Sequence, residues 1–86
     1  MDFDTVMKLL GGPAAVARFL GIKDPSVHGW RSLGIPAYRL EQLAPEIERV
    51  SNGKYMRWDV CPDVWHVRWP ELVKHPDAPV AYQAAK

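Results

Sequence analysis

The sequence has little from which to build a covalent or membrane-bound framework. Among its 86 residues there is one cysteine, Cys61, so no disulfide can form within the chain, and a reducing cytoplasm is the expected setting. No apolar run approaches the length of a membrane span. The acidic start, MDFD, also differs from the basic start of a secretory signal peptide. We therefore expect a cytoplasmic protein with no membrane partner.

The sequence also lacks the patterns that carry catalysis or metal binding. Its three histidines do not stand at metal-ligand spacing with Cys61, and there is no C-x2-C or H-E-x-x-H run. No glycine-rich loop of the phosphate-binding kind occurs. Cys61 and His66 have the side chains of a catalytic nucleophile and its base. Pro62 and the loop expected between them favour the interpretation that the two residues are neighbours in the sequence by chance. We expect no enzyme, no metal site, no cofactor and no small-molecule substrate.

Positive and negative charges almost cancel over the whole chain, but they are unevenly distributed. The net charge is +1, which is low for a protein that binds nucleic acid. Between residues 13 and 39, however, four basic residues accompany one acidic residue, a local charge of +3. Residues 40–50 hold one basic and three acidic residues, a local charge of −2. A local basic patch favours contact with DNA over one segment, with ordinary mixing of surface charges as the alternative.

What the sequence does contain is ample material for a helical core. Hydrophobic residues make up 48% of the chain and four tryptophans are present, so one folded domain is expected. Helical spacing and flanking glycines predict helices over residues 3–10, 13–20, 24–33 and from 37 towards 43 or 50. Pro45 either bends the last of these helices or divides it in two. The prediction is a mainly α bundle of four to five helices.

Residues 11–40 have the spacing of a helix-turn-helix. Ala17 is small enough for two helices to cross closely, and Gly21 permits the positive φ that the turn between them requires. Val27 and Trp30 stand three apart on one face of the second helix and are expected to pack into the core. This geometry exists mainly to place one helix in the major groove of DNA. A generic small bundle with the same pattern is the alternative.

The outward face of residues 24–33 would then read DNA. Its side chains are short or polar, which suits close approach to base edges. The predicted base contacts are Lys23, Ser26, His28, Gly29 and Ser32. The predicted phosphate contacts are the side chains of Arg18, Arg31 and Arg39 and the backbone amides of Ala14 and Ala15. For His28, a solvated surface histidine is the alternative.

The helix-turn-helix segment resembles the DNA-binding region of phage Cro-type repressors and of the related YdaS-type regulators. The shared run is GG-x-x-AVA-x-x-LGI-x-x-x-x-V-x-x-W, from Gly11 to Trp30, followed by IP and AYRLE at residues 35–41, and the similarity continues to about residue 72. The resemblance implies a Cro-like or lambda-repressor-like domain that dimerises on a palindromic operator in a phage or prophage setting. Gly29 departs from the family, which often has a hydrogen-bonding side chain there, and Pro13 replaces a polar residue.

The C-terminal part is expected to carry a different role. Alternation over residues 54–60 predicts a short strand, and three tryptophans crowd between residues 58 and 69. These tryptophans either fold back onto the helices or lie in a dimer interface. The candidate interface residues are Tyr55, Met56, Trp58, Val60 and Trp65. The chain then divides into a DNA-binding domain (residues 1–53), a C-terminal segment (54–73) and a flexible tail (74–86).

These observations together predict a sequence-specific regulator of transcription, most simply a repressor. It would bind a palindromic double-stranded DNA operator as a homodimer, with residues 24–33 in the major groove. YdaS-type proteins are often labelled antitoxins, so the resemblance also implies an alternative in which the C-terminal segment binds a partner toxin. A helical adaptor without affinity for DNA is the remaining alternative.

Overall fold

The fold is all-helical in the computed structural model, which describes residues 1–79. Its elements are α1 (Phe3–Leu10), α2 (Pro13–Leu20), α3 (Asp24–Leu33), α4 (Ala37–Val50), α5 (Arg57–Val60), α6 (Trp65–Arg68) and a 3-10 helix, η1 (Pro70–Lys74). No strand occurs among residues 1–79. The predicted mainly α fold class and its four long helices are confirmed. No helix in this part of the chain is long and apolar enough to cross a membrane.

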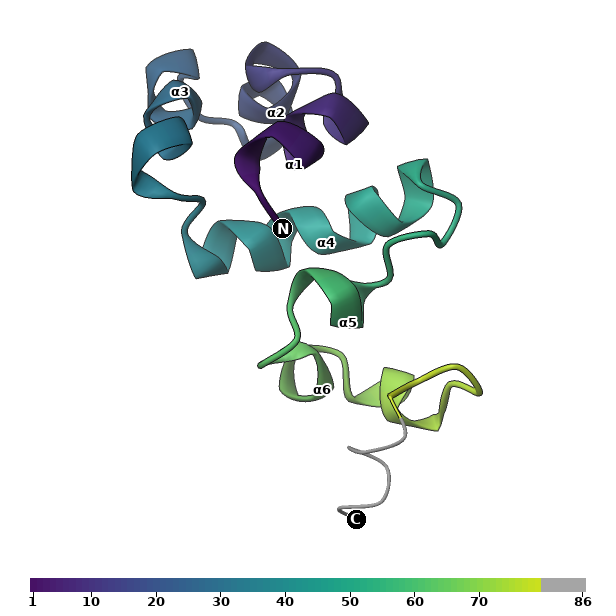
Figure 1. Ribbon diagram of the computed structural model, residues 1–86. Coiled ribbons are helices and arrows are strands. Elements are labelled where there is room, and N and C mark those ends of the chain that lie inside the picture. The colour runs from purple at the N-terminus through teal and green to yellow at the C-terminus, as the bar shows by residue number, and fades with distance from the viewer. Residues whose placement is uncertain (80–86) are drawn as a thin grey trace.

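α4 lies in the middle of the molecule and separates its two halves (Figure 1). α1, α2 and α3 gather on one side of α4, and α2 packs against α3. α5, α6 and η1 follow one another on the other side. α4 therefore contacts both halves, the first through α1 and the second through α5.

The turn between α2 and α3 depends on Gly21. Its φ of 70° is left-handed, a conformation that costs a residue with a Cβ about 1 kcal/mol. The Gly21 N–H donates to the carbonyl of Arg18 (3.3 Å), and the Ile22 N–H donates to that of Ala17 (3.0 Å). These bonds satisfy carbonyls in the last turn of α2 and end the helix. The positive φ expected at this glycine is thus present.

Pro45 lies inside α4 without ending it. The helix is continuous over 14 residues. The predicted alternative in which Pro45 divides it into two helices is therefore wrong. Proline removes one backbone donor and crowds the preceding turn. The Pro45 side chain is exposed to solvent, so its ring occupies the side of α4 that faces away from the core.

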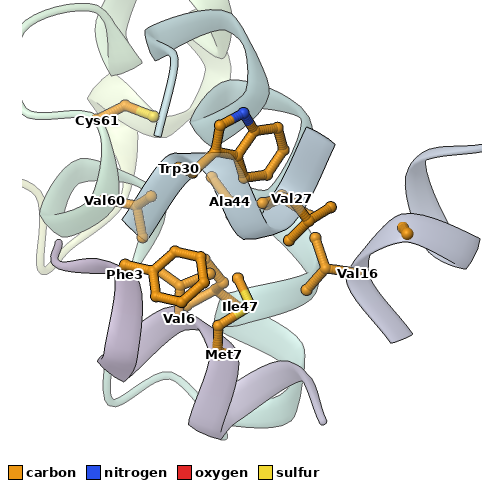
Figure 2. Packing of buried hydrophobic residues seen from close by; sticks show 12 residues of the cluster. Phe3, Val6, Met7, Val16, Val27, Trp30, Ala44, Ile47, Val60 and Cys61 are labelled. Carbon is orange, nitrogen blue, oxygen red and sulfur yellow. The ribbon is translucent and has the colours of Figure 1, made fainter. Parts of the chain in front are cut away.

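The main hydrophobic core fills the space between α1, α2, α3 and α4 (Figure 2). Val27 and Trp30 both point from α3 into this cluster, as their spacing predicts. Trp30 is 7% exposed and Ala17, on α2, is 1% exposed. Val60 and Cys61, which lie beyond α4 in the chain, complete the cluster. The largest fully buried side chains here are Val6, Val16, Val27, Leu43 and Ile47.

A second, smaller cluster lies in the C-terminal half. Its buried members are Trp65, Leu72 and Ala78, with Trp58, Trp69 and Val73 packed against them. The rings of Trp58 and Trp65 meet edge to face, with their centroids 5.7 Å apart. The tryptophans of this half thus pack within the chain. Of the predicted flexible tail, residues 74–79 include the buried Ala78, and residues 80–86 lie outside the described part of the chain.

The short strand predicted over residues 54–60 is wrong, because residues 57–60 form α5 after a turn. The Met56 N–H donates to the carboxylate of Asp59 (2.9 Å). The Met56 carbonyl accepts from the N–H groups of Asp59 (2.9 Å) and Val60 (3.2 Å). These local bonds satisfy the backbone as a helical turn, whereas a lone strand has no partner. This segment therefore offers a helical turn, and no strand, to any partner.

Arg57 joins the two halves of the molecule. Its backbone N–H and its Nε both donate to Oε1 of Glu48 on α4, each at 3.1 Å. Its Nη1 lies 3.7 Å from Oε2 of Glu71 on η1. The guanidinium also lies over the ring of Trp69, 5.5 Å from the centroid. One side chain thus holds the C-terminal cluster against α4.

We expect Arg57→Ala to lower the free energy of unfolding by about 1.5–3 kcal/mol, because the charged hydrogen bond from Nε to the partly buried Glu48 is lost. Arg49→Ala is the matched control, since Arg49 forms an exposed ion pair with Glu46 on α4, the helix that also carries Glu48. Its effect should fall within the error of the measurement. Urea denaturation followed by circular dichroism measures both. Equal losses from the two variants would contradict the bridging role of Arg57.

Candidate nucleic-acid interface

α3 presents an outward face made of small and polar side chains. Because Val27 and Trp30 turn inward, the residues between and around them face away from the core. This outward face carries Ser26, His28, Gly29 and Ser32, of which Gly29 is partly exposed and the others are exposed. Within residues 1–79, no hydrogen bond or ion pair engages the three polar side chains. Their donors and acceptors are therefore available to a partner.

Two exposed cations lie on either side of the turn at Gly21. Arg18 stands in the last turn of α2, and Lys23 is the residue that precedes α3. Both are exposed, and neither forms an ion pair with any other described residue. Long cationic side chains beside a helix-turn-helix can reach the phosphates that border a groove.

The other two arginines predicted to bind phosphate have partners within the chain. Arg31 Nη1 donates to Oδ1 of Asp4 (3.0 Å), and its guanidinium lies 4.7 Å from the ring centroid of Phe3. Arg39 Nη1 donates to Oε1 of Gln42 (2.9 Å). Sequence reasoning missed the Asp4 pair because the two residues are 27 positions apart, and only the folded chain brings α1 beside α3. Both arrangements are exposed, so a phosphate can compete for either guanidinium.

The start of α2 offers backbone donors. Gly12 precedes the helix and Pro13 is its first residue. The Val16 N–H already donates to the Gly12 carbonyl (3.1 Å). The amides of Ala14 and Ala15 lie in the first turn, where N–H groups have no carbonyl of their own helix to bind. These are the donors predicted to meet a phosphate, at the positive end of the helix dipole.

The thiol of Cys61 lies in the main core. Burial raises the pKa of the Cys61 thiol, and the nearby carboxylate of Glu41 acts in the same direction. The thiol is therefore protonated at neutral pH and is a poor nucleophile. No group of three or more potential metal ligands occurs among residues 1–79.

The residues predicted to form a dimer interface already pack within their own chain. Val60 and Trp65 are 2% and 3% exposed. Tyr55 packs against the main core, Trp58 packs against the second cluster, and Met56 is half-buried. Their role in dimerisation stays a prediction. The large apolar side chains that are exposed instead are Phe19, Leu33, Tyr38, Val64 and Val67.

Comparison with known proteins adds a family to these features. The family model described as bacterial toxin YdaS matches residues 3–68. Among curated proteins, the "Putative transcriptional regulator YdaS" of Escherichia coli (strain K12) is 34% identical over 63 residues, which cover 73% of this chain and 62% of that protein. The chain thus matches less than two thirds of that relative's length. No solved structure matches the chain.

Proposed function

This chain belongs to the YdaS family, and from that premise we propose that it regulates transcription by binding double-stranded DNA sequence-specifically, with α3 in the major groove. The observation that carries the proposal is the outward face of α3, whose polar side chains are exposed and have no partner among the described residues. A surface helix that only supported the fold would gain nothing from so many small residues. On a helix that approaches base edges, such small side chains leave room for the DNA, and their hydroxyl groups can hydrogen-bond the bases.

In this arrangement α3 supplies the base contacts. Ser26, His28 and Ser32 carry donors and acceptors that can read base edges, and Gly29 lets the DNA approach closely. Lys23, just before the helix, adds a charged donor to the same surface. Two such helices, one from each copy of a homodimer, would occupy successive major grooves of a palindromic operator.

The phosphate contacts come from the residues around α3. Arg18 is exposed and forms no ion pair with the described residues, so it can approach a phosphate at once. The amides of Ala14 and Ala15 offer two neutral donors. Arg31 and Arg39 can join by exchanging their present partners for a phosphate oxygen. Such contacts fix the position of the protein on the duplex and carry no sequence information.

Selection of bound sites from a random library of double-stranded DNA, at near-physiological salt, tests this proposal. The expected result is enrichment of a palindrome whose half-sites lie about one helical turn apart. A variant with alanine at Ser26, His28 and Ser32 is the control: it should fold, since all three side chains are exposed, and it should enrich nothing. Failure of the natural chain to enrich any sequence would overturn the proposal.

Two single substitutions separate base reading from phosphate contact. Ser26→Ala should cost about 1–3 kcal/mol on the selected site and relax the preference at one base pair. Arg18→Ala should weaken binding to all sequences alike and reduce the slope of log K against log salt by about one. Fluorescence anisotropy over a series of salt concentrations measures both. A Ser26→Ala variant with unchanged sequence preference would remove Ser26 from the reading face.

A second candidate function follows from the description of the family as a bacterial toxin. In that case the chain is the toxic member of a toxin–antitoxin pair, the reverse of the antitoxin role that the resemblance implied, and its C-terminal segment binds a partner protein. Induced expression in a bacterial host separates the two functions. Growth arrest by the natural chain but not by the triple-alanine variant would show that any toxicity depends on the proposed DNA-binding face of α3. Growth arrest by both would favour the second candidate.

A further inference from the structure

A hollow lies between α4 and α6. It has a volume of about 390 Å³ and is lined by Glu41 of α4 and by three residues in and beside α6, Val64, Val67 and Arg68. We call these four residues the α4–α6 face. A second hollow, of about 280 Å³, shares Val64 and is lined mainly by apolar side chains. No residue of α3 lines either hollow.

The α4–α6 face leaves apolar side chains uncovered. Val67 is 74% exposed and Val64 is 37% exposed, although both border the hollow. Tyr38, one helical turn before Glu41 on α4, is 58% exposed. A surface with a projecting apolar side chain next to a hollow is complementary to the same surface on a second copy, when the two copies are related by a two-fold axis.

The charges on this face decide which kind of partner fits. Arg68 Nε lies 3.4 Å from Glu41 Oε1, and the two side chains are 51% and 27% exposed. Glu41 and Arg68 are the charged residues of the face, and one acid and one base leave it without net charge. Such a surface has no excess of positive charge to attract the phosphates of a nucleic acid. An acid and a base on separate elements can, in contrast, exchange partners with the same pair on a second copy.

We propose that the α4–α6 face is the surface on which a second copy of this chain docks, in an isologous two-fold contact. Val67 of each copy enters the hollow of the other, and Glu41 of each copy pairs with Arg68 of the other. The inference rests on the proposed function, which requires two copies on one operator. It leaves α3 of both copies uncovered, because α3 lines neither hollow. It also differs from the interface predicted over residues 55–65, several of which are buried within one chain.

The substitution Val67→Glu tests this contact without threatening the fold, since Val67 is largely exposed. The dissociation constant of the dimer, measured by sedimentation equilibrium, should rise about tenfold or more. Leu33→Glu is the matched control: Leu33 is 87% exposed and lies outside the face, so the dimer should be unchanged. A natural chain that stays monomeric at the concentrations that saturate its palindrome would overturn the proposal. So would a Val67→Glu dimer as tight as the natural one.

Charge reversal tests the pairing across the two-fold axis. Glu41→Arg and Arg68→Glu should each weaken the dimer, and the double variant should restore it. Thermal unfolding of all three variants shows whether the fold has changed. Failure of the double variant to restore the dimer, with the fold intact, would overturn the pairing.

Binding to a single half-site separates this inference from the proposed function. Val67→Glu should bind one half-site as tightly as the natural chain, because α3 is untouched. A natural chain that binds DNA sequence-specifically as a monomer would keep the reading of DNA by α3 and overturn the docking surface. A natural dimer that binds no DNA would overturn the proposed function and leave the surface standing.

Discussion

Replacing Trp30 with alanine is expected to lower the free energy of unfolding by about 3–5 kcal/mol. Trp30 is 7% exposed and packs its ring from α3 into the main core. Its removal therefore leaves a large cavity between α3 and the rest of that core. Domains of this size are stabilised by roughly 5–15 kcal/mol in total. The loss is therefore a large fraction of the total stability, and it would leave a domain at the lower end of that range marginally folded at room temperature.

Urea denaturation followed by far-ultraviolet circular dichroism measures this loss, because the three remaining tryptophans would complicate a fluorescence signal. Trp30→Phe should lose less, since most of the ring volume is kept. Leu33→Ala is the control on the same helix: Leu33 is 87% exposed, and its truncation should change stability by no more than about 0.5 kcal/mol. A Trp30→Ala variant as stable as Leu33→Ala would contradict the packing described for α3.

Gly29→Ala is expected to have two effects of opposite sign. Gly29 lies inside α3, and a Cβ added there would meet nothing within 4 Å. The fold therefore does not require a glycine, and alanine should stabilise the domain by about 0.4–1 kcal/mol. The added methyl group points outward between His28 and Ser32, however, where the proposed function places the DNA. The free energy of binding to the selected site should weaken by about 1–3 kcal/mol, which is roughly a 5- to 150-fold loss of affinity.

Gly21→Ala provides the contrast, because the open space around Gly21 is similar but its φ is 70°. Alanine there should destabilise the domain by about 1 kcal/mol. Thermal unfolding and anisotropy titration on the selected duplex measure both quantities for both variants. A Gly29→Ala protein that gains stability and keeps full affinity would show that the DNA does not approach this part of α3.

The first four helices could be predicted from the sequence because their signals are local. Val27 and Trp30 repeat at helical spacing, Gly21 and Gly34 interrupt the chain, and Pro13 suits a first helical turn. Each of these signals depends only on residues that are a few positions apart in the sequence. The fold class followed from them without knowledge of any long-range contact.

The C-terminal half could not be predicted in the same way. α5 and α6 have four residues each, too few for apolar spacing to distinguish a helix from a strand. The local hydrogen bonds between Met56 and residues 59 and 60 favour the helical turn where alternation suggested a strand. The second cluster draws its buried members from positions 65, 72 and 78, whose association depends on the course of the chain between them.

The candidate site was predictable in part for a related reason. The outward direction of Ser26, His28 and Ser32 follows directly from the inward direction of Val27 and Trp30. Whether an arginine is already paired within the chain does not follow from helical spacing, because Arg31 of α3 binds Asp4 of α1. Helical geometry thus determines which residues face outward, whereas the partners of long charged side chains depend on tertiary structure.

The position of α4 between the two halves of the molecule has a consequence for how such a protein can diversify. The outward residues of α3 contribute nothing to the buried clusters on either side of α4. Substitutions among them can therefore accumulate without lowering stability or altering the far half. Under the proposed function, a lineage with this architecture can move to a new operator by changing a few exposed positions on one helix, while the selection that maintains its fold continues to act on other residues.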